Sequence, residues 1–143
     1  MPERIQAALL SKVIKYNPQI SQNRKIKILV VYNTYTQNSK DEFVAGLGNS
    51  MDVKAVYPNE IEQNISGANL VYFMSGVQNS NAICKKYKVL SVSGILKHVE
   101  HGEISLGFVI QNSKPVIVVN LTSLEKEGQT FSSDILRISK IYK

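Results

Sequence analysis

The chain of 143 residues contains a single cysteine, Cys84, and no tryptophan. One cysteine excludes an intramolecular disulfide, and a chain of this length can bury enough apolar surface to do without one. No apolar run approaches the roughly 20 residues of a membrane-spanning helix. Apolar residues make up 43% and charged residues 20%, which is typical of a globular protein. We therefore predict a single domain over residues 1–143, with Cys84 as a structural thiol; a thiolate favoured by the neighbouring lysines is the alternative.

The motifs of several enzyme classes are also missing. The sequence has no GxxxxGK[ST] phosphate loop, no GxGxxG after the first predicted strand and no GxSxG nucleophile elbow. A phosphoacceptor receiver domain needs an aspartate at the end of a central strand, where Asn33 and Ser75 stand. His98 and His101 have helical spacing, but no third metal ligand can be identified. We predict a non-enzymatic protein with no catalytic residues, no metal site and no cofactor.

The net charge of +6 and the pI of about 9.4 raise the question of nucleic-acid binding. The positive charge is spread along the chain, and its densest cluster is Lys85–Lys88. No recognition helix, zinc pairing or aromatic strand motif accompanies it. We predict no nucleic-acid binding, and a basic face that suits an anionic membrane surface or an acidic partner.

Short apolar runs alternate with amphipathic segments along the chain. This alternation predicts an α/β fold in which a mainly parallel central sheet is flanked by helices in three layers. In the first predicted helix the apolar stripe consists of Ile5, Leu9, Val13 and Tyr16, with Leu10 and Ile14 beside it. The predicted strands are Lys27–Tyr32, Asp52–Val56, Leu70–Met74 and Val89–Val92, and the predicted helices are Arg4–Tyr16, a segment from Ser39 to Leu47, Glu60–Ile65, Val77–Lys86 and Ile95–His101.

The segment from Gly102 to Ile141 predicts a C-terminal β-hairpin and a closing helix. Apolar and small residues alternate over Ile104–Ile110, a turn is expected at Gln111–Lys114, and Val116–Val119 is β-branched throughout. Asn120 is a predicted N-cap and Gly128 a predicted helix stop. Ser132-Ser133 would begin the closing helix.

This segment also carries a resemblance to a known family. The pattern of Gly102, Ile104, Phe108, Val118–Leu121, Gly128, Phe131–Ser133, Ile135, Leu136 and Ile138 resembles the C-terminal half of the YfiR-like family, and Ala7–Tyr16 resembles its first helix. The resemblance implies a bacterial periplasmic regulator that binds and represses the periplasmic part of an inner-membrane diguanylate cyclase or histidine kinase. It also implies a homodimer. Family members can carry several cysteines, and this chain departs from them there.

The location of the protein is open on the residues alone. The N-terminus MPERIQAALL has no signal-peptide pattern, which by itself favours the cytoplasm. The resemblance instead implies a mature periplasmic domain whose export signal is not part of this sequence.

Candidate ligand-binding residues follow the predicted parallel strands. Sites in such folds lie beyond the carboxyl ends of the strands. Ser75-Gly76 would open a helix and offer backbone donors to an anion, with Ser75 and Gln78 as a capping box. The alternative function is thus a soluble domain that binds a small anion or nucleotide. The candidate residues are Asn33, Ser75, Gly76, Gln78, Asn79 and Ser93.

Overall fold

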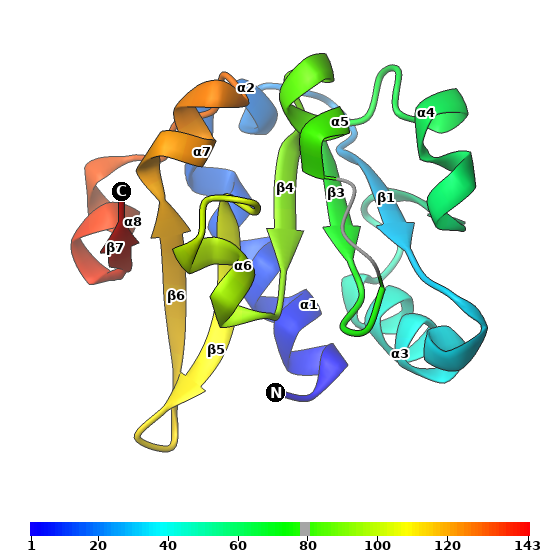
Figure 1. Ribbon diagram of the computed structural model, residues 1–143, viewed down its shortest axis with the longest axis horizontal. Coiled ribbons are helices and arrows are strands. Elements are labelled where there is room, and N and C mark those ends of the chain that lie inside the picture. Colours follow the sequence, from blue (N-terminus) through cyan, green and yellow to red (C-terminus); the bar gives the residue numbers. More distant parts are fainter. Residues whose placement is uncertain (78–80) are drawn as a thin grey trace.

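The computed structural model describes residues 1–77 and 81–143. Its strands are β1 (Lys27–Val31), β2 (Asp52–Val56), β3 (Leu70–Phe73), β4 (Leu90–Ser93), β5 (Leu106–Gln111), β6 (Lys114–Asn120) and β7 (Lys140–Tyr142). They form one sheet in the order β2-β1-β3-β4-β5-β6-β7 (Figure 1). Neighbouring strands are parallel except β5 and β6, which are antiparallel. The predicted mainly parallel sheet with a C-terminal hairpin is confirmed.

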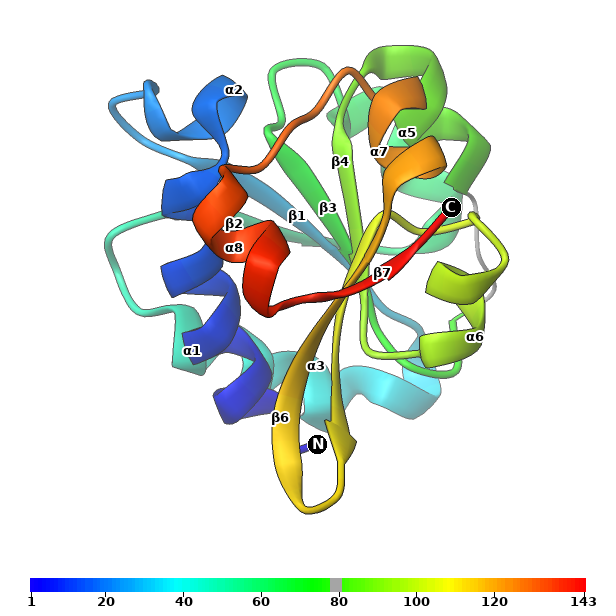
Figure 2. The same cartoon turned by 90° about the vertical axis from the view of Figure 1, so that its left-hand side faces the viewer.

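Helices cover both faces of this sheet. One face carries α1 (Glu3–Val13), α3 (Gln37–Leu47) and α8 (Ser133–Ile138), and the other carries α4 (Ile61–Asn64), α5 (Asn81–Tyr87) and α6 (Leu96–Glu100) (Figures 1 and 2). At the end where β3 and β4 begin lie α2 (Pro18–Ser21) and α7 (Leu121–Lys126). The predicted three layers are confirmed. Helices that connect parallel strands pack back onto the sheet, because these connections are right-handed.

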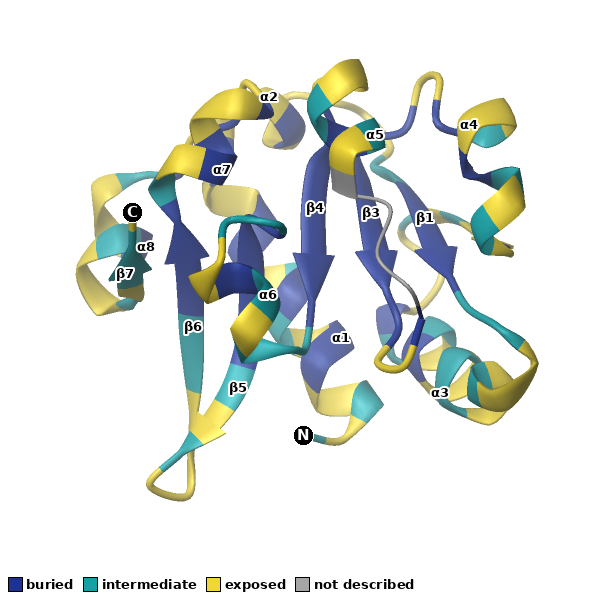
Figure 3. Cartoon of the chain, in the orientation of Figure 1, coloured by how far each residue is buried: buried dark blue, intermediate teal, exposed yellow. Residues whose placement is uncertain are grey.

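The core lies on both faces of β1, β3 and β4 (Figure 3). Val30, Val71 and Val92 have no exposed surface. A strand covered by helices on both sides must be apolar on both sides, which explains the nearly continuous apolar runs in the sequence. Each buried valine or leucine stabilises the fold by about 1.5–3 kcal/mol.

The hairpin turn between β5 and β6 is confirmed. Asn112 and Ser113 form a two-residue loop, with Gln111 paired to Lys114, and both have positive φ, 51° and 62°. Two residues of this conformation match the twist of the flanking strands. Pro115 lies opposite Ile110 and outside the part of β6 that pairs with β7. Its missing N–H therefore removes no hydrogen bond between β6 and β7.

The ends of α7 follow the sequence prediction. Asn120 accepts a hydrogen bond on Oδ1 from the Ser123 backbone N–H at 3.0 Å. Gly128 has a φ of 67°, the left-handed conformation that ends a helix at little cost for glycine. Both residues therefore act as the sequence predicted.

The start of α5 was predicted wrongly. The helix begins at Asn81 and not at Val77, so Ser75 does not cap it. Gly76 has a φ of 89°, which turns the chain, and Val77 is a buried, non-helical residue. The sequence spacing that suggested a capping box therefore reflects a tight turn, and the other residue of that spacing, Gln78, lies outside the described residues.

The apolar face of α1 was predicted only in part. Leu10, Val13 and Ile14 are buried as expected, but Ile5 and Tyr16 are each 45% exposed. The reason is a close approach of α1 to α3: a Cβ atom built on Gly46 would lie 2.8 Å from the Ala7 Cβ atom. The buried face is thus rotated toward Gln6 and Ala7, and Ile5 and Tyr16 face outward.

The chain does not finish with the closing helix. After α8, the strand β7 pairs in parallel with Val118–Asn120 of β6 and becomes the edge of the sheet. A strand of three residues is too short to show the alternation by which strands are recognised. The closing helix is confirmed, and β7 is an addition to it.

Candidate functional site

The residues predicted at the strand ends are partly brought together. Asn33, directly after β1, accepts hydrogen bonds on Oδ1 from the backbone N–H groups of Tyr35 and Thr36, both at 3.0 Å. Its Nδ2 donates to the Gly76 carbonyl at 3.4 Å, which links the loop after β1 to the loop after β3. The 3₁₀ helix Thr34–Thr36 that Asn33 caps runs straight into α3, so α3 begins two residues before the predicted Ser39.

The remaining candidates differ in accessibility. Ser75 is exposed beside Gly76, whereas Ser93 is only 1% exposed and accepts a hydrogen bond from the Ile95 backbone N–H at 3.2 Å. Gln78 and Asn79 lie outside the described residues. The binding role of the six candidates stays a prediction, and Asn33 with Gly76 is the pair in contact.

A buried polar cluster, which the sequence did not reveal, surrounds the carboxylate of Glu127. This side chain has no exposed surface. It accepts hydrogen bonds from the Ser91 backbone N–H at 2.9 Å, from the Ser91 hydroxyl at 2.6 Å and from the Ser105 hydroxyl at 2.6 Å. Lys85 Nζ lies 3.3 Å from the carboxylate and donates to the Ser123 hydroxyl at 3.0 Å. A buried charge requires such partners, because its desolvation is otherwise too costly.

The Glu127 cluster connects four parts of the chain. Lys85 comes from α5, Ser91 from β4, Ser105 from the residues just before β5, and Glu127 from the end of α7. A lysine beside a serine hydroxyl is also the arrangement of some nucleophilic enzymes. Here Ser123 is only 1% exposed, so no substrate reaches its hydroxyl. The cluster therefore links these four parts of the chain through buried polar contacts.

Cys84 lies beside this cluster and is structural, as predicted. Its side chain is fully buried on α5. Burial raises the pKa of the Cys84 thiol, and nearby Glu127 raises the pKa further while Lys85 lowers it. The neutral thiol is thus strongly favoured, and the alternative of a lysine-activated thiolate is wrong.

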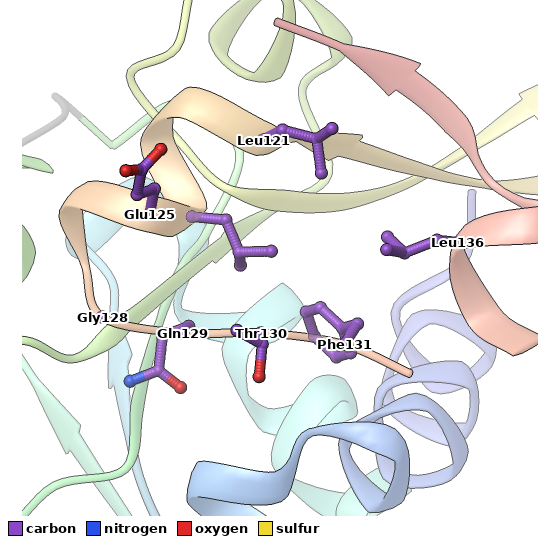
Figure 4. Close-up of a pocket in the computed structure, with 8 residues that line it drawn as sticks. Leu121, Glu125, Gly128, Gln129, Thr130, Phe131 and Leu136 are labelled. Carbon is purple, nitrogen blue, oxygen red and sulfur yellow. The ribbon is translucent and has the colours of Figure 1, made fainter. Parts of the chain in front are cut away.

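An apolar pocket of about 440 Å³ lies between α7 and α8 (Figure 4). Leu121, Phe131 and Leu136 point into the space between the two helices. The Gln129 side chain turns away and is held by Asn17, whose Nδ2 donates to Gln129 Oε1 at 2.9 Å. The pocket thus has an apolar interior on a fixed segment of chain. Its leucines and phenylalanine belong to the segment that carries the family resemblance, but the sequence did not suggest a cavity.

The two histidines with metal-ligand spacing lie on α6 and directly after it. No group of three or more His, Cys, Asp or Glu side chains able to hold a metal ion occurs in the described part of the chain. His98 is half-buried on α6 and His101 is exposed at its end. Within residues 1–77 and 81–143, no helix has the length and apolar content to cross a membrane.

Solved structures with the same fold share little sequence with this chain. An ABC domain from Streptococcus pneumonia in complex with L-Trp gives a TM-score of 0.70 at 15% identity, covering 99% of this chain and 60% of its own. A conserved domain protein from Vibrio cholerae gives 0.66 at 13% identity, with coverage of 96% and 60%. A ligand-free, open substrate-binding protein with adhesive properties from Clostridium difficile gives 0.66 at 18% identity, with coverage of 92% and 58%. This chain thus spans about 60% of each of these proteins, and the likeness concerns the fold alone.

Sequence comparison is more specific. The comparison with curated proteins found no match. The family described as YfiR/HmsC-like matches residues 3–140, nearly the whole chain. The match includes both segments that carry the resemblance, Ala7–Tyr16 and the pattern from Gly102 to Ile138. The chain belongs to the YfiR/HmsC-like family.

Proposed function

We propose that this protein is a non-enzymatic periplasmic regulator that binds the periplasmic part of an inner-membrane diguanylate cyclase or histidine kinase and represses its output. The observation that carries the proposal is the family match over residues 3–140. The family is one of periplasmic signalling regulators that act with membrane proteins. The choice of a cyclase or kinase as partner, repression as the effect, and cyclic di-GMP signalling as the pathway are the finer parts of the proposal.

The absence of enzymatic activity is consistent with the burial of the chemically active groups. In the described part of the chain, the serines that surround Glu127 are almost wholly buried, and the side chain of Lys85 beside them is 20% exposed. The thiol of Cys84 is buried too. A regulator needs an accessible binding surface and does not need these groups to be reachable.

A surface suited to a protein partner lies on α1 and α8, which cover the same face of the sheet (Figure 2). Ile5 of α1 and Tyr16 of the 3₁₀ helix Ile14–Tyr16 that follows it are each 45% exposed, and Ile138 of α8 is 68% exposed. The two helices are joined where the Ser132 backbone N–H donates to the Tyr16 carbonyl at 2.9 Å. Aromatic and aliphatic side chains on rigid elements are common anchors of interfaces. We assign partner binding to this α1–α8 face, defined by Ile5, Tyr16 and Ile138; a homodimer could use the same face.

A binding experiment tests this assignment. The protein is immobilised and presented with the detergent-solubilised membrane cyclase or kinase encoded beside it. Changing Tyr16 to alanine together with Ile138 to aspartate should weaken capture by at least about tenfold, since loss of interface anchors typically costs 2 kcal/mol or more. The control is Tyr87→Ala on the opposite face of the sheet, where the tyrosine is 38% exposed. Equal capture by all three proteins would exclude the α1–α8 face, and no capture by the unchanged protein would contradict the partner assignment.

The second candidate function is binding of a small ligand. It is favoured by the 440 Å³ pocket between α7 and α8, a volume within the roughly 300–1,000 Å³ range of ligand sites. Its interior favours a ligand with an apolar part, in contrast to the anion or nucleotide expected at the strand ends. Nuclear magnetic resonance titration with a panel of amino acids and nucleotides separates the two sites. Saturable shifts at Leu121 and Leu136 would support the pocket, shifts at Asn33 and Gly76 would support the strand-end site, and no shift would exclude both for that panel.

A further inference from the structure

The strand β2 forms one edge of the sheet, because it pairs with β1 and with no other strand in the described part of the chain. Its residues Asp52, Lys54 and Ala55 are exposed, and Val53 is half-buried. The opposite edge is β7, which has only three residues. An exposed edge strand can pair with a strand of another molecule, and β2 is the longer of the two edges.

The backbone of β2 divides its polar groups between two sides. The Asp52 N–H donates to the Ile26 carbonyl at 2.9 Å, so the backbone groups of Asp52 point toward β1. In a strand, the N–H and carbonyl groups of successive residues point to opposite neighbours. The backbone groups of Val53 and Ala55 therefore point away from β1, toward the open edge.

The charges of β2 favour one way of pairing two copies. In an antiparallel pair with Val53 opposite Val53 of a second copy, Asp52 of each copy lies opposite Lys54 of the other, on the same face of the sheet. Opposite charges in this position are favourable. With Val53 opposite Ala55, the two Lys54 side chains would lie together, which is unfavourable. With Ala55 opposite Ala55, both charged residues would lie opposite uncharged ones.

Both charged side chains are available for such a contact. Among residues 1–77 and 81–143, neither Asp52 nor Lys54 forms an ion pair, although Asp52 lies beside Lys27 of β1. Lys54 Nζ donates to Asn64 Oδ1 at 2.6 Å. An ammonium group carries three N–H donors, so Lys54 can keep this hydrogen bond and still bind a carboxylate.

We propose that two copies of this chain pair antiparallel through β2, with Val53 opposite Val53, and join their sheets into one. The same surface is used by both copies, so the assembly closes as a dimer and does not grow into a filament. Because the contact is centred on a strand of five residues, we expect a weak dimer. The β2 edge is distinct from the α1–α8 face, and the inference does not depend on the membrane partner proposed above.

The test is analytical ultracentrifugation of the protein from about 10 µM to about 1 mM, where weak complexes form. The expected result is a reversible shift from monomer to dimer that added salt weakens, because the charge pairs are exposed. Asp52→Lys and Lys54→Asp should each weaken self-association about tenfold, since each places like charges opposite one another. Lys97→Asp is the control: it makes the same charge change at an exposed lysine of α6 and should leave the dimer unchanged.

Mixing the two β2 variants separates the proposal from a folding defect. In a mixed pair, both lysines of the Asp52→Lys chain lie opposite aspartates of the Lys54→Asp chain. The equimolar mixture should therefore dimerise about as tightly as the unchanged protein, a recovery that misfolded variants cannot show. A protein that is monomeric at every concentration, or a mixture that stays monomeric, would overturn the proposal.

The same measurement separates the β2 edge from the α1–α8 face. The variant that combines Tyr16→Ala with Ile138→Asp should dimerise as the unchanged protein does. A dimer that is lost in this variant and kept in both β2 variants would lie at the α1–α8 face, which would contradict the pairing through β2.

Discussion

Glu127 shows how much a single side chain can connect in this protein. Its carboxylate, which has no exposed surface, accepts two serine hydroxyls and one backbone N–H and pairs with Lys85. Ser91 of β4 provides the backbone N–H and one hydroxyl, Ser105 before β5 provides the other hydroxyl, and Lys85 belongs to α5. Removal of the carboxylate leaves the Lys85 charge and the buried donors without their acceptor.

We expect Glu127→Ala to lower the free energy of unfolding by about 3–5 kcal/mol, the usual cost of breaking a buried ion pair by removing one partner. Urea denaturation followed by circular dichroism measures this loss. Glu125→Ala is the control, since Glu125 is an exposed residue of α7 two positions before Glu127, and its loss should change stability by less than about 0.5 kcal/mol. A loss below 1 kcal/mol for Glu127→Ala would mean that the cluster is not the anchor described above.

Cys84 makes stability depend on pH in the alkaline range. Burial raises the pKa of the folded thiol above its ordinary value of 9.0. The unfolded chain therefore ionises first, so the contribution of the thiol is complete below pH 9.0 and falls as the pH rises. The free energy of unfolding of the unchanged protein, relative to that of Cys84→Ala, should fall by about 2 kcal/mol between about pH 8 and about pH 10.5. An advantage that stays constant over this range would show that the thiol ionises equally in both states.

At the scale of elements, the hairpin of β5 and β6 stores strain in its turn. Ser113 has a φ of 62°, a conformation that costs a non-glycine residue roughly 1 kcal/mol. Ser113→Gly should therefore raise the free energy of unfolding by about 0.5–1 kcal/mol. Ser50→Gly, an exposed serine without positive φ, should instead lower stability slightly, because glycine adds freedom to the unfolded chain. Thermal or urea unfolding distinguishes the two, and a loss of stability in Ser113→Gly would contradict the turn geometry.

The elements that the sequence predicted best are those whose signal is local. The strands β1 and β3, the cap Asn120 and the stop Gly128 each depend on a short run of residues, and each was found where expected. The start of α5 was misjudged because Ser75 and Gly76 have the residue types of both a cap and a turn, and only the φ of 89° decides between them. The strand β7 exists because β6 is beside it, which no local pattern records.

The candidate sites were harder to predict for the same reason. Asn33 and Gly76 are 43 residues apart, and their contact follows from the parallel sheet, which the sequence did predict. The Glu127 cluster includes contacts between residues 14 to 42 positions apart, and its only sequence sign is the presence of Ser91 and Ser105 in apolar segments. The pocket between α7 and α8 depends on how Phe131 and Leu136 are oriented, which sequence spacing does not determine.

At the scale of the whole molecule, a rigid three-layer domain presents different surfaces for different tasks. The α1–α8 face carries exposed apolar side chains, and the pocket between α7 and α8 is lined mainly by apolar ones. The helix α7, which lines the apolar pocket, is held in place by Glu127 after one end and Asn120 at the other. Ligand binding in that pocket would contact this helix directly.

The central claim concerns repression of a membrane signalling enzyme. The most direct measurement is the output of a membrane diguanylate cyclase or histidine kinase from the same organism, reconstituted in membrane vesicles with its periplasmic part exposed to the added protein. The account predicts that output falls in a saturable manner when the protein is added, and that the protein changed at Tyr16 and Ile138 requires about tenfold more for the same effect. Output that remains unchanged at saturating protein, with the enzyme active and the periplasmic part accessible, would contradict the account.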